Sequence, residues 1–252
     1  MLAEKRKKTI LELIHKKEVV TVPEIASKCN SSEITARRDL LELEEKGLLI
    51  RTHGGAVKSN TMVNGMFGFE KKIEQNKDNK EYICKKAAEY INDNDIIFID
   101  CGSTLYYLCK YINRKMNVKV ITNSLPVVSE LINYPNIKIT LIGGEIDSER
   151  KAIYGPTAEK YIEEYHVQKA FIGADGVSVN GGLSSNDEKE SAITKKMASS
   201  ADTVFLLCDS SKIEKDSMMK FAPLSIVDYL ITDKEIDPGI SNNYNELNIQ
   251  VI

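Results

Sequence analysis

Apolar residues recur at helical spacing near the start of the chain. Ile10, Leu13 and Ile14 fall on one face amid Lys and Glu, which is the pattern of a half-buried amphipathic helix. Thr21 is followed three residues later by Glu24, a spacing that is typical of a capping box. The pattern therefore predicts one helix around Ile14 and a second, shorter helix that opens at Thr21.

A third helix is predicted to follow directly. Ser32 can cap its amino terminus, and Ala36, Leu40 and Leu43 form its inward stripe. Gly47 is placed to end it in a left-handed turn.

Leu48 and Ile50 then alternate with Leu49 and Arg51 in the segment LLIR, residues 48–51, which runs into His53-Gly54-Gly55. Alternation followed by a glycine turn is typical of a strand and a tight hairpin. Helix, short helix, turn, helix and hairpin form the layout of a winged helix-turn-helix domain.

From about residue 80 the pattern changes to short apolar runs separated by amphipathic stretches such as STLYYLCKYI and ESAITKKMA. The runs are IIFID (96–100), VKVIT (118–122), IKITLI (137–142), KAFIGA (169–174), TVFLLC (203–208) and DYLIT (228–232). Strands that alternate with helices favour an α/β fold with a mainly parallel sheet and helices on both faces.

These patterns divide the chain into three parts. Residues 59–79 are rich in Asn, Gly and Lys and have no sustained period, so they are expected to be a linker. A winged helix-turn-helix domain is expected over residues 1–58, and a larger α/β domain over residues 80–252.

Composition and charge narrow the class of protein. The chain of 252 residues is 42% hydrophobic and 28% charged, which suits a globular core. Its net charge of −3 argues against a wholly basic nucleic-acid coat protein. Residues 1–58 nevertheless carry 12 Lys and Arg against 9 Asp and Glu, whereas the remainder carries 22 against 28. The basic amino-terminal part is therefore the candidate for contact with phosphates.

The five cysteines are odd in number and form no paired C-x-x-C motifs, so neither a zinc site nor a secreted disulfide framework is expected. No oxygen-ligand loop appears either, and no metal or cofactor is predicted. The amino terminus lacks an uninterrupted apolar region, and no run approaches the ~20 apolar residues of a membrane span. A cytoplasmic protein is expected.

The outward side of the third predicted helix carries Thr35, Arg38 and Glu42, with Arg37 beside them. Arginine can pair with guanine in the major groove, and hydroxyls can bind phosphates or base edges. The alternative is that both arginines pair with Asp39, Glu42 or Glu45 on a solvated helix. The preceding short helix, the hairpin and the local positive charge favour DNA.

These residues resemble a known family. The blocks TVPEIA, SEITARRDL and GLLIRTHGGA are similar to the amino-terminal domain of the DeoR family of bacterial transcription regulators, over most of residues 3–57. The resemblance implies that residues 32–45 form the recognition helix and that the wing touches DNA backbone or minor groove. Ser31 stands where the family usually has an apolar residue. The expected DNA-contacting residues are Ser32, Glu33, Thr35, Arg37, Arg38, Arg51, His53 and Gly54.

A phosphate site is suggested by FIDCGST, where Asp100 to Thr104 follow a predicted strand and open a helix. The carboxyl ends of strands in open α/β sheets bind ligands, and a glycine turn with hydroxyls and free helix amides can hold a phosphate. The same tripeptide is often only a turn and helix cap. Other strands also end in polar or glycine turns, and in a parallel sheet these ends converge.

The blocks DCGST, ITNS, LIGGE, FIGADG and CDSSK also resemble the DeoR effector domain, whose fold is similar to sugar-phosphate isomerases. The resemblance implies a phosphorylated sugar as ligand. Thr194 stands where many members have lysine, and for Asn123 and Lys212 the alternatives are turn capping and a solvated charge. The expected effector-binding residues are Asp100, Gly102, Ser103, Thr104, Asn123, Asp175, Glu190 and Lys212.

The sequence thus predicts a DNA-binding transcription regulator, a repressor of a sugar uptake or catabolism operon that responds to a phosphosugar. Its partners would be operator DNA, the effector and further copies of itself, because one small winged helix makes few contacts. An active sugar-phosphate isomerase and a DNA-bound scaffold without ligand are the alternatives. Asp175 and Glu190 could serve as acid and base, but no histidine lies near them in the sequence.

Overall fold

The computed structural model describes residues 3–17, 19–45, 48–58, 69, 72–112 and 117–252. The chain splits into two units, Met1–Glu70 and Lys71–Ile252. Gly47, which was expected to end the third helix, lies outside the described residues, as does most of the predicted linker.

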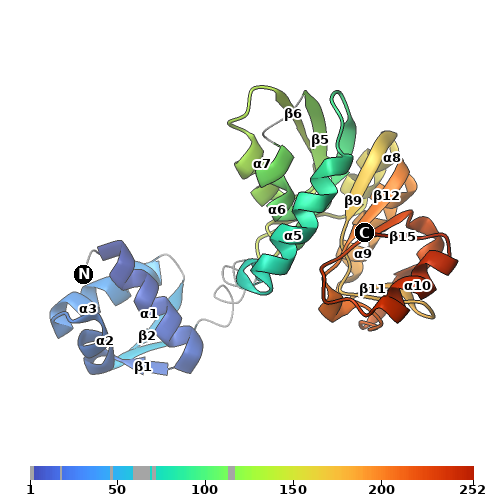
Figure 1. Ribbon diagram of the computed structural model, residues 1–252. Helices are drawn as coiled ribbons and strands as arrows, with labels where there is room; N and C mark the ends of the chain where they lie inside the picture. The colour runs from blue at the N-terminus through green and yellow to red at the C-terminus, as the bar shows by residue number, and fades with distance from the viewer. Residues whose placement is uncertain (1–2, 18, 46–47, 59–68, 70–71, 113–116) are drawn as a thin grey trace. The chain divides into compact units, whose positions relative to one another are not determined.

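The amino-terminal unit contains the predicted helices and hairpin (Figure 1). Its elements are α1 (Ala3–Lys17), β1 (Val19–Thr21), α2 (Val22–Cys29), α3 (Glu33–Glu45), β2 (Leu49–Thr52) and β3 (Gly55–Lys58). The Thr21 hydroxyl accepts from the Glu24 amide and the Glu24 carboxylate accepts from the Thr21 amide, so the capping box forms. The three strands pair antiparallel in the order β1-β3-β2.

One hydrophobic core holds this unit together. Ile10 and Ile14 of α1, Ile25 of α2, and Leu40 and Leu43 of α3 are almost fully buried in it. The helical stripes read from the sequence therefore meet in a single cluster, and burial of such side chains stabilises each by about 1.5–3 kcal/mol.

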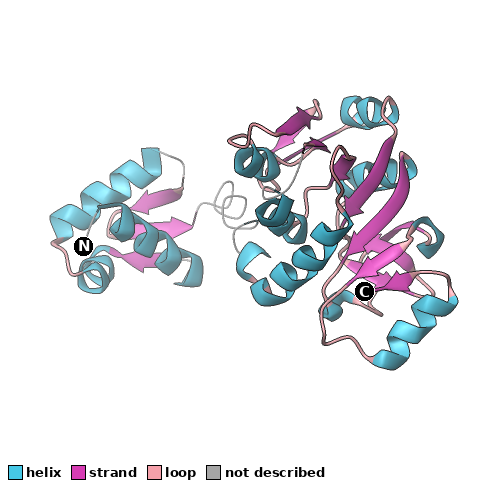
Figure 2. Ribbon diagram, turned by 45° about the horizontal axis from the view of Figure 1, so that its top comes forward, coloured by secondary structure: helices cyan, strands magenta, loops and turns pink. Residues whose placement is uncertain are grey.

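The larger unit is built on a seven-stranded parallel sheet in the order β15-β14-β12-β9-β4-β5-β6. Its strands are β4 (Ile96–Ile99), β5 (Val118–Thr122), β6 (Ile137–Leu141), β9 (Val167–Ile172), β12 (Ala201–Leu207), β14 (Tyr229–Ile231) and β15 (Gln250–Val251). Its helices are α5 (Lys77–Ala87), η1 (Ala88–Tyr90), α6 (Ser103–Ile112), α7 (Leu125–Leu131), α8 (Pro156–Glu163), α9 (Glu188–Ser199), η2 (Ser210–Lys212), η3 (Leu224–Ile226) and α10 (Pro238–Glu246). The predicted fold class is confirmed (Figure 2).

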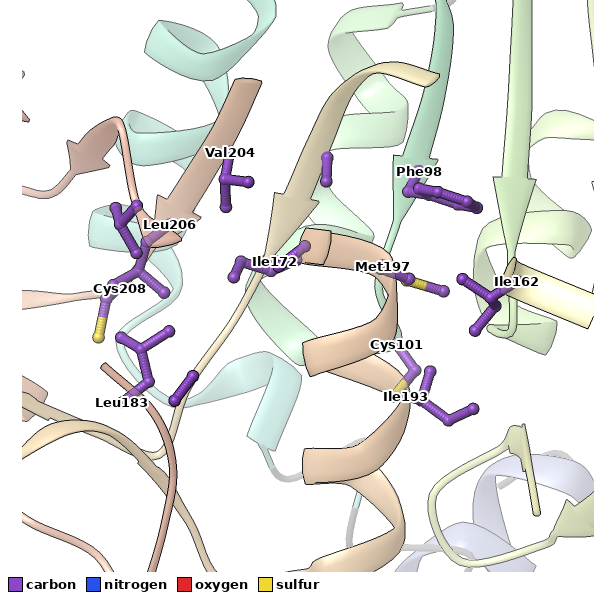
Figure 3. Packing of buried hydrophobic residues seen from close by; sticks show 14 of the residues in the cluster. Phe98, Cys101, Ile162, Ile172, Leu183, Ile193, Met197, Val204, Leu206 and Cys208 are labelled. Atoms are coloured by element: carbon purple, nitrogen blue, oxygen red, sulfur yellow. The ribbon is translucent and has the colours of Figure 1, made fainter. Parts of the chain in front are cut away.

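Alternate residues of the central strands enter two different cores. Ile97 and Ile99 pack with residues of α5, α6 and α7, whereas Phe98 packs with residues of α8 and α9. Figure 3 shows the second core, with Ile193 and Met197 of α9 among the strand residues. Because both faces are covered, the strands read as continuous apolar runs in the sequence.

Two small antiparallel sheets were not predicted. One pairs β7 (Glu145–Asp147) with β8 (Ala152–Tyr154), and the other joins β10 (Gly176–Ser178), β11 (Gly182–Ser185) and β13 (Met219–Ala222). Strands of three or four residues are too short to show a period.

The end of the predicted linker belongs to the larger unit. Asn76 Nδ2 donates to Asp209 Oδ1 at 3.2 Å, and Tyr107 Oη donates to the Ile73 carbonyl at 3.1 Å. These contacts lie within the unit that begins at Lys71, nine residues before the expected boundary.

Candidate functional site

The turn between α2 and α3 is set by local chemistry. Asn30 ends α2 in the left-handed conformation, with φ at 47°. Ser32 Oγ then accepts from the Thr35 amide at 3.2 Å and pairs with Thr35 Oγ1 at 2.9 Å. Two short helices joined by a tight turn are thereby held as a helix-turn-helix pair.

The outward face of α3 combines positive charge with apolar surface. Arg37 and Arg38 have side chains that are 55% and 70% exposed. Ile34 and Leu41 lie on the same face because residues three, four and seven positions apart align along a helix. They are 81% and 41% exposed.

Each of these arginines has an acid one turn away. Arg37 Nη2 lies 3.5 Å from Glu33 Oε2, and Arg38 Nε lies 3.9 Å from Glu42 Oε1. Exposed pairs of this kind contribute little to stability, so a DNA ligand can displace the carboxylates at small cost.

Asp39, which the sequence offered as a further surface partner for the arginines, is 1% exposed. It accepts from Arg6 of α1, with the Arg6 Nη2 to Asp39 Oδ1 distance at 2.9 Å. Glu42 also contacts Lys7 of α1. One side of α3 is therefore tied to α1, while the side with Arg37 and Arg38 faces solvent.

The hairpin between β2 and β3 turns at His53 and Gly54, which are exposed. The Arg51 amide donates to Glu44 Oε1 at 2.8 Å, which ties the wing to α3. A Cβ at Gly55 would lie 2.0 Å from the Val20 carbonyl oxygen, so β1 and β3 need glycine here.

In the larger unit, four adjacent strands in the order β12-β9-β4-β5 bring the predicted ligand residues to one edge of the sheet. Their carboxyl ends lead respectively to Lys212, Asp175, Ser103 and Asn123. The carboxyl ends of these neighbouring parallel strands lie along one edge of the sheet, as expected from the sequence.

Lys80 of α5 is a residue at this edge that the sequence interpretation missed. It is 4% exposed, and its Nζ donates to Ser103 Oγ at 3.1 Å, at the amino terminus of α6. Burial lowers the pKa of Lys80 to about 8, and the positive charges of Lys212 and Lys72 act in the same direction, against Asp209. A buried ammonium beside two more lysines suits a bound anion.

The sequence did contain a signal for Lys80. It stands at the first position of the stripe Lys80, Ile83, Cys84, Ala87, which is the buried face of α5. A charge on an apolar stripe is rarely buried without a partner, so it marks a candidate site.

Lys212 and Asp175 lie close to the same place. Lys212 Nζ donates to the Ala174 carbonyl at 3.0 Å. Asp175 Oδ2 accepts from the Asn186 amide at 3.0 Å. Burial alone would raise the pKa of Asp175, but the Asn186 amide and the charges of Lys72, Lys212 and Arg150 lower it. Asp175 is therefore held ionised.

Arg150 was not predicted. It comes from the turn between β7 and β8, and its Nη1 donates to Glu190 Oε2 at 2.6 Å, with Asp187 Oδ2 at 3.7 Å from Nη2. Burial raises the pKa of Glu190 to about 7 despite the opposing charge of Arg150, and the negative charges of Asp100 and Asp175 add to the rise. The contact spans forty residues, so no local sequence pattern marks it.

Two predicted effector residues are buried in the fold. Asp100 is 1% exposed, and its oxygens accept from the Cys101 amide at 2.7 Å and from Thr194 Oγ1 at 2.8 Å. Burial raises the pKa of Asp100. Asn123 donates to the Ile153 carbonyl at 3.1 Å. Both side chains shape the loops around the edge.

The remaining members of the expected phosphate turn differ in exposure. Gly102 and Ser103 are half-buried, whereas Thr104 is buried and its carbonyl accepts from the Cys84 thiol at 3.0 Å. Among the residues that the structure describes, no cluster of His, Cys, Asp or Glu could hold a metal ion. No helix in that part of the chain is long and apolar enough to span a membrane.

Family comparisons agree with this architecture. A model of the DeoR-like helix-turn-helix domain matches residues 6–62, and a model of the DeoR C-terminal sensor domain matches residues 75–234. The chain therefore belongs to the DeoR family of transcriptional regulators.

Two relatives are similar over nearly the whole chain. The L-fucose operon activator of Haemophilus influenzae is 31% identical over 247 residues, which cover 98% of each chain. The lactose phosphotransferase system repressor of Streptococcus mutans is 36% identical over 252 residues, covering 98% of this chain and 99% of the relative. Among solved structures, ribose 5-phosphate isomerase A from Methanocaldococcus jannaschii matches 56% of each chain with a TM-score of 0.42 and 23% identity.

Proposed function

We propose that this protein represses a sugar uptake or catabolism operon by binding its operator, and that a phosphorylated sugar controls the binding. The observation that carries the effector proposal is the buried contact of Lys80 with Ser103 at the amino terminus of α6. The protein acts in the cytoplasm as a homo-oligomer, a dimer or a tetramer, because several winged helices are needed for a specific site.

The DNA contacts come from two elements. α3 enters the major groove. There Arg37 and Arg38 leave their carboxylate partners and bind guanine edges or phosphates. Ser32, Glu33 and Thr35 lie at the amino-terminal end of this helix. Arg51, His53 and Gly54 of the wing contact the backbone or the minor groove. The exposure of Arg37 and Arg38 supports this assignment.

The phosphate of the effector lies at the amino terminus of α6, on the amides of Gly102, Ser103 and Thr104 and on the ammonium groups of Lys80 and Lys212. Asp175 and Glu190 face the sugar hydroxyls. The buried side chains of Asp100 and Asn123 hold the loops around the phosphate site in position.

The matching relatives are regulators, and we infer that the protein is not an enzyme. A Glu190 pKa of about 7 is one that an acid–base catalyst would need, so isomerisation is the second candidate. Incubation with ribose 5-phosphate tests it, and no ketose product is expected. Product that disappears in Asp175→Asn would reverse the inference.

The effector proposal is tested by melting the full chain with a panel of sugar phosphates, their parent sugars and inorganic phosphate. All 11 tyrosines lie in residues 82–244, so tyrosine fluorescence follows the larger unit alone. One sugar phosphate should raise its melting temperature, because a ligand of the native state stabilises it.

The matched variants are Lys80→Met, which removes the buried ammonium, and Lys85→Met, which changes an exposed lysine of the same helix. Lys85→Met should keep the ligand-induced rise, and Lys80→Met should lose most of it. An equal rise in both variants would show that Lys80 does not hold the phosphate.

A further inference from the structure

Ile34 is the most exposed large hydrophobic side chain in the described part of the chain, at 81%. It stands in the first turn of α3, where the other large apolar residues of the helix, apart from Leu41, pack inward. The described residues cover little of the Ile34 side chain, so its apolar surface is available to a ligand.

The neighbours of Ile34 indicate what that ligand is. Arg37 and Arg38 stand three and four residues further on, directly beside Ile34 on the same face of the helix. A surface that meets this face must present negative charge around a small apolar group. Duplex DNA does so in the major groove, where phosphates border the floor and the 5-methyl group of thymine projects from it.

We propose that Ile34 contacts the 5-methyl group of a thymine in the operator and is thereby a specificity-determining residue of α3. The proposal rests on the DNA binding proposed above and names one base that α3 recognises. Arginine can select guanine, whereas Ile34 selects a T·A pair at a neighbouring position, since thymine is the only one of the four bases that presents a methyl group in the major groove.

The chain offers a matched control. Leu41 is also an exposed aliphatic residue of this face, but it lies seven residues further along α3, about 10 Å from Ile34 along the axis. The amino-terminal part of a recognition helix contacts the bases. Leu41 should therefore not contact the same thymine.

The experiment begins with selection of duplexes from a random library by the full-length protein. Each thymine of the selected operator is then replaced by uracil, which removes only the 5-methyl group. Affinities are measured for the wild type, Ile34→Ala and Leu41→Ala. At one or more positions uracil should weaken wild type and Leu41→Ala about fourfold, the effect of one methyl-sized apolar contact, and should leave Ile34→Ala unchanged.

Three results would overturn the proposal. If the chain selects no sequence, the proposed function fails as well. If sequence-specific binding occurs but uracil has no effect at any position, only the thymine contact fails. If uracil weakens wild type and Ile34→Ala equally, another residue contacts the methyl group.

Discussion

At position 31 a serine hydroxyl is buried and has no hydrogen-bond partner within the described residues. The DeoR family usually has an apolar residue there, and a buried hydroxyl without a partner costs about 1–3 kcal/mol. Ser32, its neighbour, uses its hydroxyl to cap α3. Adjacent serines thus have opposite effects on stability.

Ser31→Ala should therefore raise the stability of the amino-terminal unit by about 1 kcal/mol. Ser32→Ala should lower it by a similar amount, because the cap is lost. Hydrogen exchange of residues 3–58 in the full chain measures both. A destabilised Ser31→Ala would mean that the hydroxyl has a partner in solution.

Glu190 predicts a pH dependence for the larger unit. Its pKa is about 7 in the fold, whereas the ordinary pKa of a glutamate is 4.5, so the folded chain binds the proton more tightly than the unfolded chain does. The contribution of Glu190 to the free energy of unfolding is complete below about pH 4.5 and is lost as the pH rises through about 7.

Glu190→Gln lacks this titratable group. Between about pH 5 and about pH 8 its free energy of unfolding should therefore fall less than that of the wild type, by an amount on the order of 2 kcal/mol. Tyrosine fluorescence melting at both pH values measures the change. Glu188→Gln, an exposed acid of the same helix, should keep the wild-type slope. Parallel slopes for all three proteins would contradict the assignment.

At the scale of elements, the wing depends on a close approach of β1 and β3. Gly55→Ala would place a Cβ 2.0 Å from the Val20 carbonyl oxygen, whereas nothing lies within 4 Å of a Cβ at Gly54. Gly55→Ala should therefore destabilise the amino-terminal unit by roughly 2 kcal/mol or more, since a backbone must shift.

Gly54→Ala should leave stability nearly unchanged, and it then isolates the DNA contact proposed for the wing. Far-UV circular dichroism and operator affinity of both variants separate the two effects. Equal melting of Gly54→Ala and Gly55→Ala would mean that β1 and β3 are further apart than the structure has them.

The regular elements could be predicted from the sequence because their patterns are local. β5 (Val118–Thr122) and α6 (Ser103–Ile112) have the bounds read from the apolar runs. The strands of the small antiparallel sheets were missed because three or four residues carry no period. The order of the strands within the large sheet was not predicted either, since pairing is not local.

The candidate site was harder to predict than the fold. Ser103 and Lys212 follow strands and could be placed at the ligand edge, but Lys80 was assigned only to the start of the large domain. Asp39 looked like a surface acid and is buried against Arg6. Arg150 reaches Glu190 only through the β7–β8 turn. Such contacts depend on packing between distant segments.

At the scale of the whole molecule, the two units must be energetically coupled if the effector controls DNA binding. The factor by which the effector changes DNA affinity must equal the factor by which DNA changes effector affinity, and it is typically about 5–150. Fluorescence anisotropy of a labelled operator, with and without the effector, gives the first factor. Calorimetric titration of the effector gives the second.

Lys80→Met should bind operator DNA as the wild type does and should not respond to the effector. Wild-type protein that binds the effector with no change in DNA affinity would show that the two units are not coupled. The direction of the change distinguishes an effector that releases the operator from one that promotes binding.

The acids that accompany Arg37 and Arg38 have a consequence for how the protein finds its site. Glu33 and Glu42 already give each arginine an anionic partner. If Arg37 and Arg38 bind DNA as proposed, each must leave its carboxylate, and this small cost is the same on random DNA and on the operator. A guanine with two aligned acceptors offsets that cost more fully than a single phosphate does. The pairs would then favour the operator slightly over other sequences.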